Sequence, residues 1–218
     1  MAAQEELAIP VDGGSLGATL TLPDEPSGLV LFAHGSGSSR TSPRNRLVAG
    51  VLVEARLGTL LMDLLTPEEE VEDIRTAALR FDIPLLAGRL TAAADLARED
   101  QRLRDLGLGL FGASTGAAAA LVTAADRPLE VHAVVSRGGR PDLARRRLAA
   151  VRAPTLLIVG GEDVEVIEMN RAALAELTGA ESNLEIVPGA THLFEEPEAL
   201  ERVADLARDW FLRYLPGP

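Results

Sequence analysis

The chain has 218 residues, of which 47% are hydrophobic and 25% are charged, and its formal net charge at pH 7 is −12. This size and balance predict one soluble globular domain, residues 1–218, with a sizeable core. The acidic balance argues against nucleic acid as a partner, because the binding of phosphates depends on a basic surface.

Cysteine and lysine are both absent from the sequence, since the 21 basic residues are all arginine. Without cysteine the chain can form no disulfide, no thiolate nucleophile and no cysteine-ligated zinc site. Without lysine it has no Walker-type phosphate loop and no Schiff-base amine. No apolar run approaches the ~20 residues of a membrane span, and the acidic start lacks the pattern of a secretory signal. We therefore expect a cytoplasmic protein with no membrane partner.

Short apolar runs alternate with helical segments, which predicts an α/β fold with a mostly parallel central sheet and helices on both faces. The alternating segments 7–11 and 18–22 predict an antiparallel hairpin at one edge of the sheet. Further strands are expected at residues 28–33, 59–63, 108–112, 131–136, 154–160 and 183–187. Helices are expected at residues 44–55, over most of 64–104 with breaks near residues 66–67 and 83–84, from the turn at residue 114 to about 125, and at 198–214. The one dense basic run, Arg145 to Arg147, is expected on a solvated helix face.

The most informative segment is Gly112-Ala113-Ser114-Thr115-Gly116, which lies between a predicted buried strand and an alanine-rich predicted helix. A G-x-S-x-G sequence in this context is typical of a nucleophile elbow, a tight strained turn that presents the serine hydroxyl above the sheet. Glycine at the two flanking positions lets the strand and the helix approach each other without Cβ clashes. The pattern predicts Ser114 as a nucleophile.

Polar candidates follow most of the predicted strands. Open parallel sheets place their sites outside the carboxyl ends of the strands. In chain order these ends carry His34 to Gly37, Asp63, Ser114, Ser136 and Arg137, Asp163, and the loop that contains His192. The groups that could perform chemistry are therefore expected at one edge of the sheet.

A serine hydroxyl needs a general base, and the chain offers three histidines. His132 lies inside a predicted strand, where a packing or surface role is expected. His34 lies in the turn after a strand, where its ring is expected to brace the loop by hydrogen bonds. His192, on the loop after the last strand, is the predicted base, and the alternative is a surface histidine with no role in catalysis.

The third member of such a site orients the imidazole and stabilises its cation. Asp163 is predicted for this role because it directly follows the strand at 154–160. Glu162 and Glu165 are its competitors, and their alternative roles are solvation of the loop or capping of the following helix. The chain order Ser114, Asp163, His192 fits a nucleophile elbow.

An oxyanion needs two backbone N–H donors that are held in place before the reaction. Thr115, next to the nucleophile, and Ser36, in the glycine-rich turn after the first buried strand, are the predicted donors. That turn fails the G-x-G-x-x-G pattern of a dinucleotide loop, because Arg40 occupies the position of the third glycine. No histidine pair has metal-ligand spacing, so no metal is expected.

The chain resembles the α/β-hydrolase superfamily, and within it the small capless proteins that are similar to dienelactone hydrolases. The resemblance covers essentially the whole chain, and the segments that carry it are His34 to Gly37, Gly112 to Gly116, Gly160 to Asp163 and Gly189 to Phe194. It implies that Ser114, Asp163 and His192 form a triad and that Ser36 and Thr115 form the oxyanion hole. Some relatives of this kind are fused to a domain resembling phosphoribosyltransferases, for which this chain is too short.

The chain departs from dienelactone hydrolases proper in having serine where they carry a cysteine nucleophile. This difference shifts the expectation toward general carboxylester hydrolysis. The interval 137–152, where many α/β-hydrolases insert a cap, is short, so the site is expected to be open. Residues 66–89 are the more plausible local cover, and their apolar side chains either shield an acyl group or pack on the sheet.

Arg137 follows a strand at the expected edge of the site. An arginine there could bind a substrate carboxylate. The alternative is a structural arginine that pairs with Asp142 or with a helix terminus.

Taken together, the residues predict a serine hydrolase that cleaves small carboxylic esters or lactones through an acyl-serine intermediate, without cofactor or metal. Thioester hydrolysis and acyl transfer use the same groups, and a catalytically silent binding module is the alternative from another class. The sequence does not specify the oligomeric state.

Overall fold

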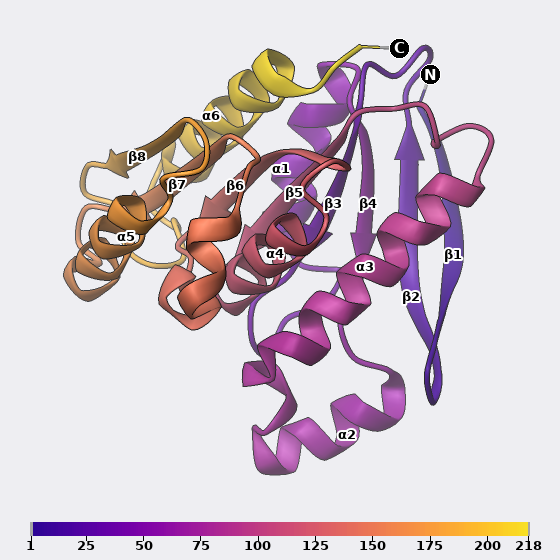
Figure 1. Ribbon diagram of the computed structural model, residues 1–218, viewed down its shortest axis with the longest axis horizontal. Coiled ribbons are helices and arrows are strands. Elements are labelled where there is room, and N and C mark those ends of the chain that lie inside the picture. The colour runs from indigo at the N-terminus through magenta and orange to yellow at the C-terminus, as the bar shows by residue number, and fades with distance from the viewer. Residues whose placement is uncertain (1, 218) are drawn as a thin grey trace.

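The computed structural model describes residues 2–217 and contains an eight-stranded sheet with helices on both faces (Figure 1). The strands are β1 (Ala3–Val11), β2 (Gly14–Leu22), β3 (Leu29–Ala33), β4 (Gly58–Met62), β5 (Leu108–Ala113), β6 (Val131–Arg137), β7 (Thr155–Gly160) and β8 (Ser182–Val187). Their spatial order is β1-β2-β4-β3-β5-β6-β7-β8. Strand β2 pairs antiparallel with β1 and β4, whereas the strands from β4 to β8 pair in parallel. The predicted α/β fold with an antiparallel edge is confirmed.

Helices connect the strands and bury both faces of the sheet. They are α1 (Pro43–Glu54), α2 (Pro67–Thr76), α3 (Ile83–Glu99), α4 (Thr115–Asp126), α5 (Val164–Glu176) and α6 (Ala199–Tyr214), with 3₁₀ segments η1 (Leu79–Phe81) and η2 (Pro141–Ala150). Helices α3 and α4 lie on one face, in front of the sheet in Figure 1. Helices α1 and α6 contribute to the core on the other face.

The central strands are apolar along their whole length because they are covered on both sides. In β3 every residue is buried, and the side chains alternate between the two cores. Leu29, Leu31 and Ala33 pack on the α3 and α4 side, whereas Val30 and Phe32 pack on the α1 and α6 side. This alternation places any polar residue near a strand end on a defined face of the sheet.

The edge hairpin is longer than the alternation of apolar residues predicts. Its register pairs Ile9 with Leu16, and Gly13 takes a φ of +87° in the turn, which favours glycine. Leu16 and Leu20 of β2 are buried against the core that α3 covers. The hairpin therefore extends the sheet and closes one side of that core.

Segment 64–104 is mostly helical, as expected, and new helices begin at the two predicted breaks, near residues 66–67 and 83–84. Helix α2 begins after Thr66, whose side chain forms a capping box with Glu69, and α3 begins at Ile83 with Asp82 as its N-cap. The run from Arg145 to Arg147 is exposed, in the 3₁₀ segment η2. Among residues 2–217, no helix combines the length and apolar character needed to cross a bilayer.

Candidate active site

Ser114 lies in a strained turn between β5 and α4. Its φ of 49° and ψ of −119° are unfavourable for a residue with a side chain, and such strain is typical of functional turns. Three backbone hydrogen bonds, each of 3.1 Å, hold the turn: the Ser114 N–H donates to the Arg137 carbonyl, and the N–H groups of Ala117 and Arg140 donate to the Ser114 carbonyl. The conformation is that of a nucleophile elbow.

The two glycines that flank the elbow lie where the backbones are in close contact. A Cβ atom on Gly116 would lie 2.5 Å from the carbonyl oxygen of His34, and one on Gly112 would lie 2.7 Å from the backbone nitrogen of Ala117. Real Cβ atoms essentially never approach backbone atoms so closely. Glycine at these positions lets α4 begin directly above the strand ends.

Asp163 and His192 are brought together by the loops that follow β7 and β8. The Nδ1 atom of His192 lies 2.6 Å from Oδ2 of Asp163, and the Glu162 N–H donates to the Ala190 carbonyl at 2.9 Å, which joins the two loops. Because a carboxylate only accepts hydrogen bonds, this contact favours the imidazole tautomer with its proton on Nδ1 and its lone pair on Nε2. The competitors Glu162 and Glu165 are exposed, and no hydrogen bond joins either to His192 among the described residues.

Ser114 and His192 line one cavity of about 180 Å³ at the carboxyl edge of the sheet. Its walls come from the loop after β3, the start of α1, the ends of β5 and β6, and the His192 loop. The residues that line it are Gly35, Ser36, Ser38, Ser42, Arg44, Ala113, Ser114, Arg137, His192 and Leu193. The cavity thus joins four of the six residues that the sequence singles out.

The other two residues, Thr115 and Asp163, lie next to residues that line this cavity but do not line it themselves. Thr115 is buried at the start of α4, and its hydroxyl lies 3.1 Å from the hydroxyl of Ser36. These two residues line a smaller pocket of about 20 Å³. Asp163 contacts His192 and is the less accessible of the two residues. Its side chain is 16% exposed, whereas the side chain of His192 is 40% exposed.

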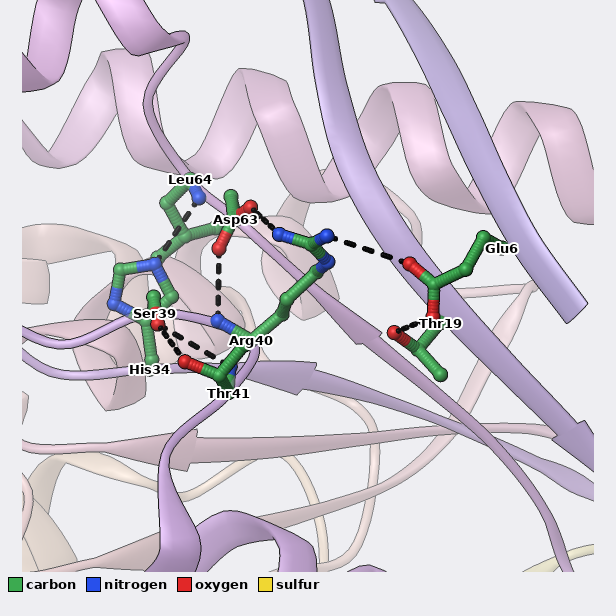
Figure 2. Close-up of polar contacts among 8 residues, drawn as sticks. All are labelled: Glu6, Thr19, His34, Ser39, Arg40, Thr41, Asp63 and Leu64. Atoms are coloured by element: carbon green, nitrogen blue, oxygen red, sulfur yellow. Dashed lines mark hydrogen bonds and ion pairs between the residues drawn. The ribbon is translucent and has the colours of Figure 1, made fainter. Parts of the chain in front are cut away.

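The loop that carries Ser36 is fixed by a network of charged residues (Figure 2). Both the backbone N–H and Nη1 of Arg40 donate to the Asp63 carboxylate, each at 2.8 Å. Arg40 Nη2 also donates to Glu6 on β1 at 3.3 Å, and Glu6 accepts a hydrogen bond from Thr19 at 2.7 Å. Asp63, at the end of β4, therefore anchors the loop and does not line the cavity with Ser114.

His34 braces the same loop, as predicted. Its Nε2 accepts the Leu64 N–H at 3.1 Å, so Nδ1 carries the proton and donates to the Gly35 carbonyl at 2.9 Å. Burial lowers the pKa of His34, which favours this neutral form. His132 is structural too: it is the extra residue at an irregularity of the β5–β6 pairing, and its Nδ1 accepts the Leu108 N–H at 3.2 Å.

Arg137 does not pair with Asp142, so that half of the structural alternative is wrong, whereas its hydrogen bond to Asn45 joins it to the first turn of α1, a helix terminus. Asp142 instead accepts two hydrogen bonds from Arg140, each at 2.8 Å. Arg137 is on the opposite side of the sheet, where its Nη2 donates to Oδ1 of Asn45 at 3.4 Å. Only 8% of Arg137 is exposed, and within residues 2–217 it forms no ion pair.

The segment 66–89 borders the site with only part of its length. Leu86 and the polar residues Glu70, Asp73 and Arg80 line the small pocket beside Thr115. Three apolar residues of the segment neither cover the site nor pack on the sheet, since they are more than half exposed: Val71, Ile74 and Phe81. Residues 2–217 contain no group of three or more His, Cys, Asp or Glu side chains arranged to hold a metal ion.

Sequence reasoning missed the contribution of α1. Ser42, its N-cap, and Arg44 line the cavity, and Asn45 contacts Arg137 from the same turn. The serine before Pro43 is a signal for the start of a helix. It does not indicate that this helix starts beside a strand end some ninety residues further along the chain.

Comparison with known proteins agrees with this architecture. A sequence profile described as the alpha/beta hydrolase family matches residues 9–206. A crystal structure of a dienelactone hydrolase from Anabaena variabilis is 56% identical to this chain and superposes on it with a TM-score of 0.95. The match covers 98% of this chain and 99% of that chain. Est1E from Butyrivibrio proteoclasticus shares the fold at 18% identity and a TM-score of 0.77, with 95% of this chain and 98% of that chain covered.

Two curated relatives from Mycobacterium tuberculosis strains, each called a putative phosphoribosyl transferase, are 55% identical over 214 residues. These residues make up 98% of this chain but 47% of each relative, so the chain spans about half the length of the curated relatives it matches. The family profile and the Anabaena structure, in contrast, extend over nearly the whole chain. The chain therefore belongs to the α/β-hydrolase family and is similar to dienelactone hydrolases.

Proposed function

We propose that this protein is a serine hydrolase that cleaves small carboxylic esters or lactones through an acyl intermediate on Ser114. The observation that carries the proposal is the 2.6 Å contact between His192 and Asp163, next to a cavity that His192 shares with a serine in an elbow conformation. A nucleophile, a base and a group that orients the base are the parts that acyl transfer requires.

In this scheme Nε2 of His192 takes the proton of the Ser114 hydroxyl as the oxygen attacks the ester carbonyl. Asp163 stabilises the imidazolium that forms, and the imidazolium then protonates the departing alcohol. Water attacks the acyl-serine in the second half of the reaction, and His192 acts as the base again. The acid leaves, and Ser114 regains its proton.

The oxyanion of each tetrahedral intermediate is assigned to the N–H groups of Ser36 and Thr115. Thr115 is the first residue of α4, where an N–H has no partner within the helix and the helix dipole favours negative charge. Ser36 lies in the loop that Asp63 and Arg40 hold in place. Donors fixed before the reaction are each worth ~2.7–4 kcal/mol of transition-state stabilisation.

The name of the Anabaena relative supports a lactone as one form of the substrate, and serine at position 114 supports esters in general. We infer that the phosphoribosyl transfer in the names of the mycobacterial relatives belongs to the part that this chain does not span. Thioester hydrolysis and acyl transfer to another acceptor use the same groups, so a substrate screen must include them.

The first test is labelling with a fluorophosphonate probe, followed by mass measurement of the intact protein. We expect one adduct on the wild type and none on Ser114→Ala. Ser136→Ala is the matched control: Ser136 is a fully buried serine at the end of the neighbouring strand, and its removal should leave labelling unchanged. A folded wild type that reacts with neither the probe nor any ester would point instead to a binding module with a silent site.

A further inference from the structure

Helix α2 has an apolar face that nothing in its own chain covers. Val71 and Ile74 are three positions apart, so they lie on one side of the helix, and they are 64% and 71% exposed. The buried residue of α2 is an acidic one, Asp73. Isolated helices shorter than ~12–15 residues are marginal in water, and helices in proteins are stabilised mainly by the packing of an apolar face. Since α2 has 10 residues, its exposed face is the part of the helix that still needs a partner.

The same helix is acidic. Five of its ten residues are aspartate or glutamate, and one is arginine. Three of the acidic residues form ion pairs within the chain: Glu69, Glu72 and Asp73. Glu68 forms no ion pair within residues 2–217, and it lies one turn before Val71 on the same side of the helix. The uncovered face of α2 thus combines two apolar side chains with negative charge.

A groove of about 930 Å³ lies between α3, α4 and η2. Its apolar lining includes Phe81 of η1, Ile83 of α3, Val122 of α4 and Leu143 of η2. Gly88 on α3 leaves the groove open, because a Cβ atom added there would meet no atom within 4 Å. Segment η1 contacts α2, so the groove and the helix adjoin at Phe81. Figure 1 shows α2 below α3, on the outside of the molecule.

Arginines line the groove on the side of η2. Arg147 forms an ion pair with Asp126, whereas Arg145 and Arg146 are exposed and form no ion pair within the part of the chain that the structure describes. Arg145 has a φ of 49° and a ψ of −131°, a strained conformation of the kind that clusters at functional surfaces. The other acidic residue of the groove, Asp82, is already the N-cap of α3. The groove therefore combines an apolar lining with positive charge, in a molecule whose formal net charge is −12.

Two ion pairs hold α2 on its own chain in the orientation that leaves its apolar face exposed. The Nε atom of Arg80 donates to Asp73 at 2.7 Å, and the buried Arg89 donates to Glu69 at 2.6 Å. Asp73 also accepts the backbone N–H groups of Leu79 and Arg80, which fixes η1 against the helix. Because α2 is fixed in this way, its exposed face does not turn into the groove of the same chain, and its partner is another molecule.

The groove and the exposed face of α2 complement each other. The helix face is acidic and presents two apolar side chains, and the groove is apolar with arginines along one side. Because the two surfaces adjoin at Phe81, a twofold axis near that residue would bring each α2 to the groove of the other copy. Such an exchange uses both surfaces at once and closes the assembly as a dimer.

We propose that a second copy of this chain occupies the groove. The exposed face of α2 from one protomer packs between α3, α4 and η2 of its partner, and the exchange is reciprocal. Attraction between Glu68 and the arginines at positions 145 and 146 sets the orientation. Helix α2 also carries Glu70 and Asp73, which line the small pocket beside Thr115, so the dimer would fix one wall of the candidate site. The proposal does not depend on the hydrolase function proposed above.

Sedimentation velocity over a series of protein concentrations tests the proposal. We expect the wild type to have twice the mass of one chain. A variant with both Val71→Gln and Ile74→Gln, and a second variant with Gly88→Leu, should each raise the dissociation constant of the dimer by about tenfold or more. Glutamine favours helix almost as well as alanine, and the leucine enters open space, so circular dichroism should show that both variants stay folded.

Two control variants separate these effects from general changes of the surface. Gly50→Leu is matched to Gly88→Leu, since Gly50 is also a helical glycine with no atom within 4 Å of an added Cβ, but it is on α1 and outside the groove. Leu129→Gln removes an almost fully exposed leucine that does not line the groove. Neither substitution should change the mass in solution.

Exchange of charges tests which surfaces meet. A groove variant with both Arg145→Glu and Arg146→Glu, and a helix variant with Glu68→Arg, should each be monomeric, because like charges then face each other at both contacts. An equimolar mixture of the two variants should regain the dimer. In the mixed pair one contact has exchanged charges and the other has the wild-type charges, so both attract. Arg46→Glu, an exposed position on α1, is the charge control and should remain dimeric.

Three results would overturn the proposal. A wild type that is monomeric at every concentration would mean that a different protein, or none, covers this face. A dimer that the groove and helix variants leave intact would use another surface. A mixture of the two charge variants that stays monomeric would show that α2 does not meet the groove of its partner. Fluorophosphonate labelling of Ser114 reports on the proposed function separately, so a silent site would leave these mass measurements unchanged.

Discussion

At the scale of single residues, Arg137 stands out because its burial should destabilise the folded protein and the structure shows little that compensates for this. Taking a guanidinium out of water costs several kcal/mol unless an ion pair and hydrogen bonds compensate it. Within residues 2–217 the compensation is one long hydrogen bond to Asn45. A residue retained for stability would be apolar at this position, so the stability of a variant separates a structural arginine from one that serves a ligand.

We therefore expect Arg137→Met to raise the stability of the ligand-free protein by about 1–3 kcal/mol. Methionine fills much of the same volume and removes the unpaired charge. Thermal unfolding of both proteins in the same buffer measures the effect as a rise in Tm. Arg140→Met is the control, because Arg140 makes two hydrogen bonds to Asp142 and its loss should give no rise. A fall in Tm for Arg137→Met would assign Arg137 a structural role.

His34 gives a second prediction at this scale, on the pH dependence of stability. Burial lowers its pKa below the value of about 6.5 in the unfolded chain, so the unfolded state binds more protons as the pH falls below 6.5. The contribution of His34 is therefore fully present above pH ~6.5 and is lost as the pH falls, by at most ~1.4 kcal/mol per pH unit. Carboxylates with lowered pKa values, such as Asp73, act at more acidic pH.

Urea unfolding of the wild type and of His34→Gln at pH 7.5 and pH 5.5 measures this effect. We expect the free energy of unfolding to fall less between the two pH values in the variant than in the wild type. Some dependence should remain, because burial also lowers the pKa of His132. The same loss in both proteins would mean that His34 does not titrate in this range.

At the scale of elements, the strands and the elbow were predictable because their signals are local. The apolar run before Gly112 and the alanines after Gly116 identify a buried strand and a helix without any distant information. The alternative that paired Arg137 with Asp142 was wrong because closeness in sequence does not determine which face of the sheet a side chain reaches. Residues 133, 135 and 137 of β6 point to the side of α1 and α6, whereas η2, which carries Asp142, packs with α4 on the other side.

The approach of α1 to the site could not be predicted for a related reason. Its apolar pattern shows that it packs on the sheet, and the pattern does not show which strand end its first turn meets. Asn45 and Arg137 are neighbours because β3 and β6 lie on either side of β5, a topology that no local pattern contains. The predicted residues of the site were those that follow strands, and the missed ones were those that begin a helix.

The crossing of α4 over β5 leads to a prediction about this pair of elements. Gly116→Ala should cost about 3 kcal/mol or more, or prevent folding, because the new methyl group meets the carbonyl oxygens of Ala33 and His34. Gly50→Ala on α1 is the control, since nothing lies within 4 Å of the added carbon and alanine favours the helix by ~0.5–1 kcal/mol. Chemical unfolding measures both changes, and equal effects would show that the crossing is not tightly packed.

At the scale of the whole molecule, one sheet separates two large cores that have no buried residue in common. Leu90 of α3 is fully buried on one side, and Trp210 of α6 packs on the other, where its Nε1 donates to the Pro154 carbonyl at 3.3 Å. Trp210 is the sole tryptophan in the sequence, so its fluorescence reports on the α6 side alone. The chain is expected to unfold as one domain, because the strands between the two cores contribute side chains to both.

Leu90→Ala tests this coupling across the sheet. The cavity left in the α3 side should cost about 2–5 kcal/mol. If the molecule is one cooperative unit, the transition seen by Trp210 fluorescence shifts by the same amount as the transition seen by far-ultraviolet circular dichroism, although the substitution lies on the other side of the sheet from the probe. A fluorescence transition that stays at its wild-type position while the circular dichroism shifts would show that the two sides unfold separately. The site draws Arg137 and Asn45 from one side and the start of α4 from the other, so its geometry depends on this coupling.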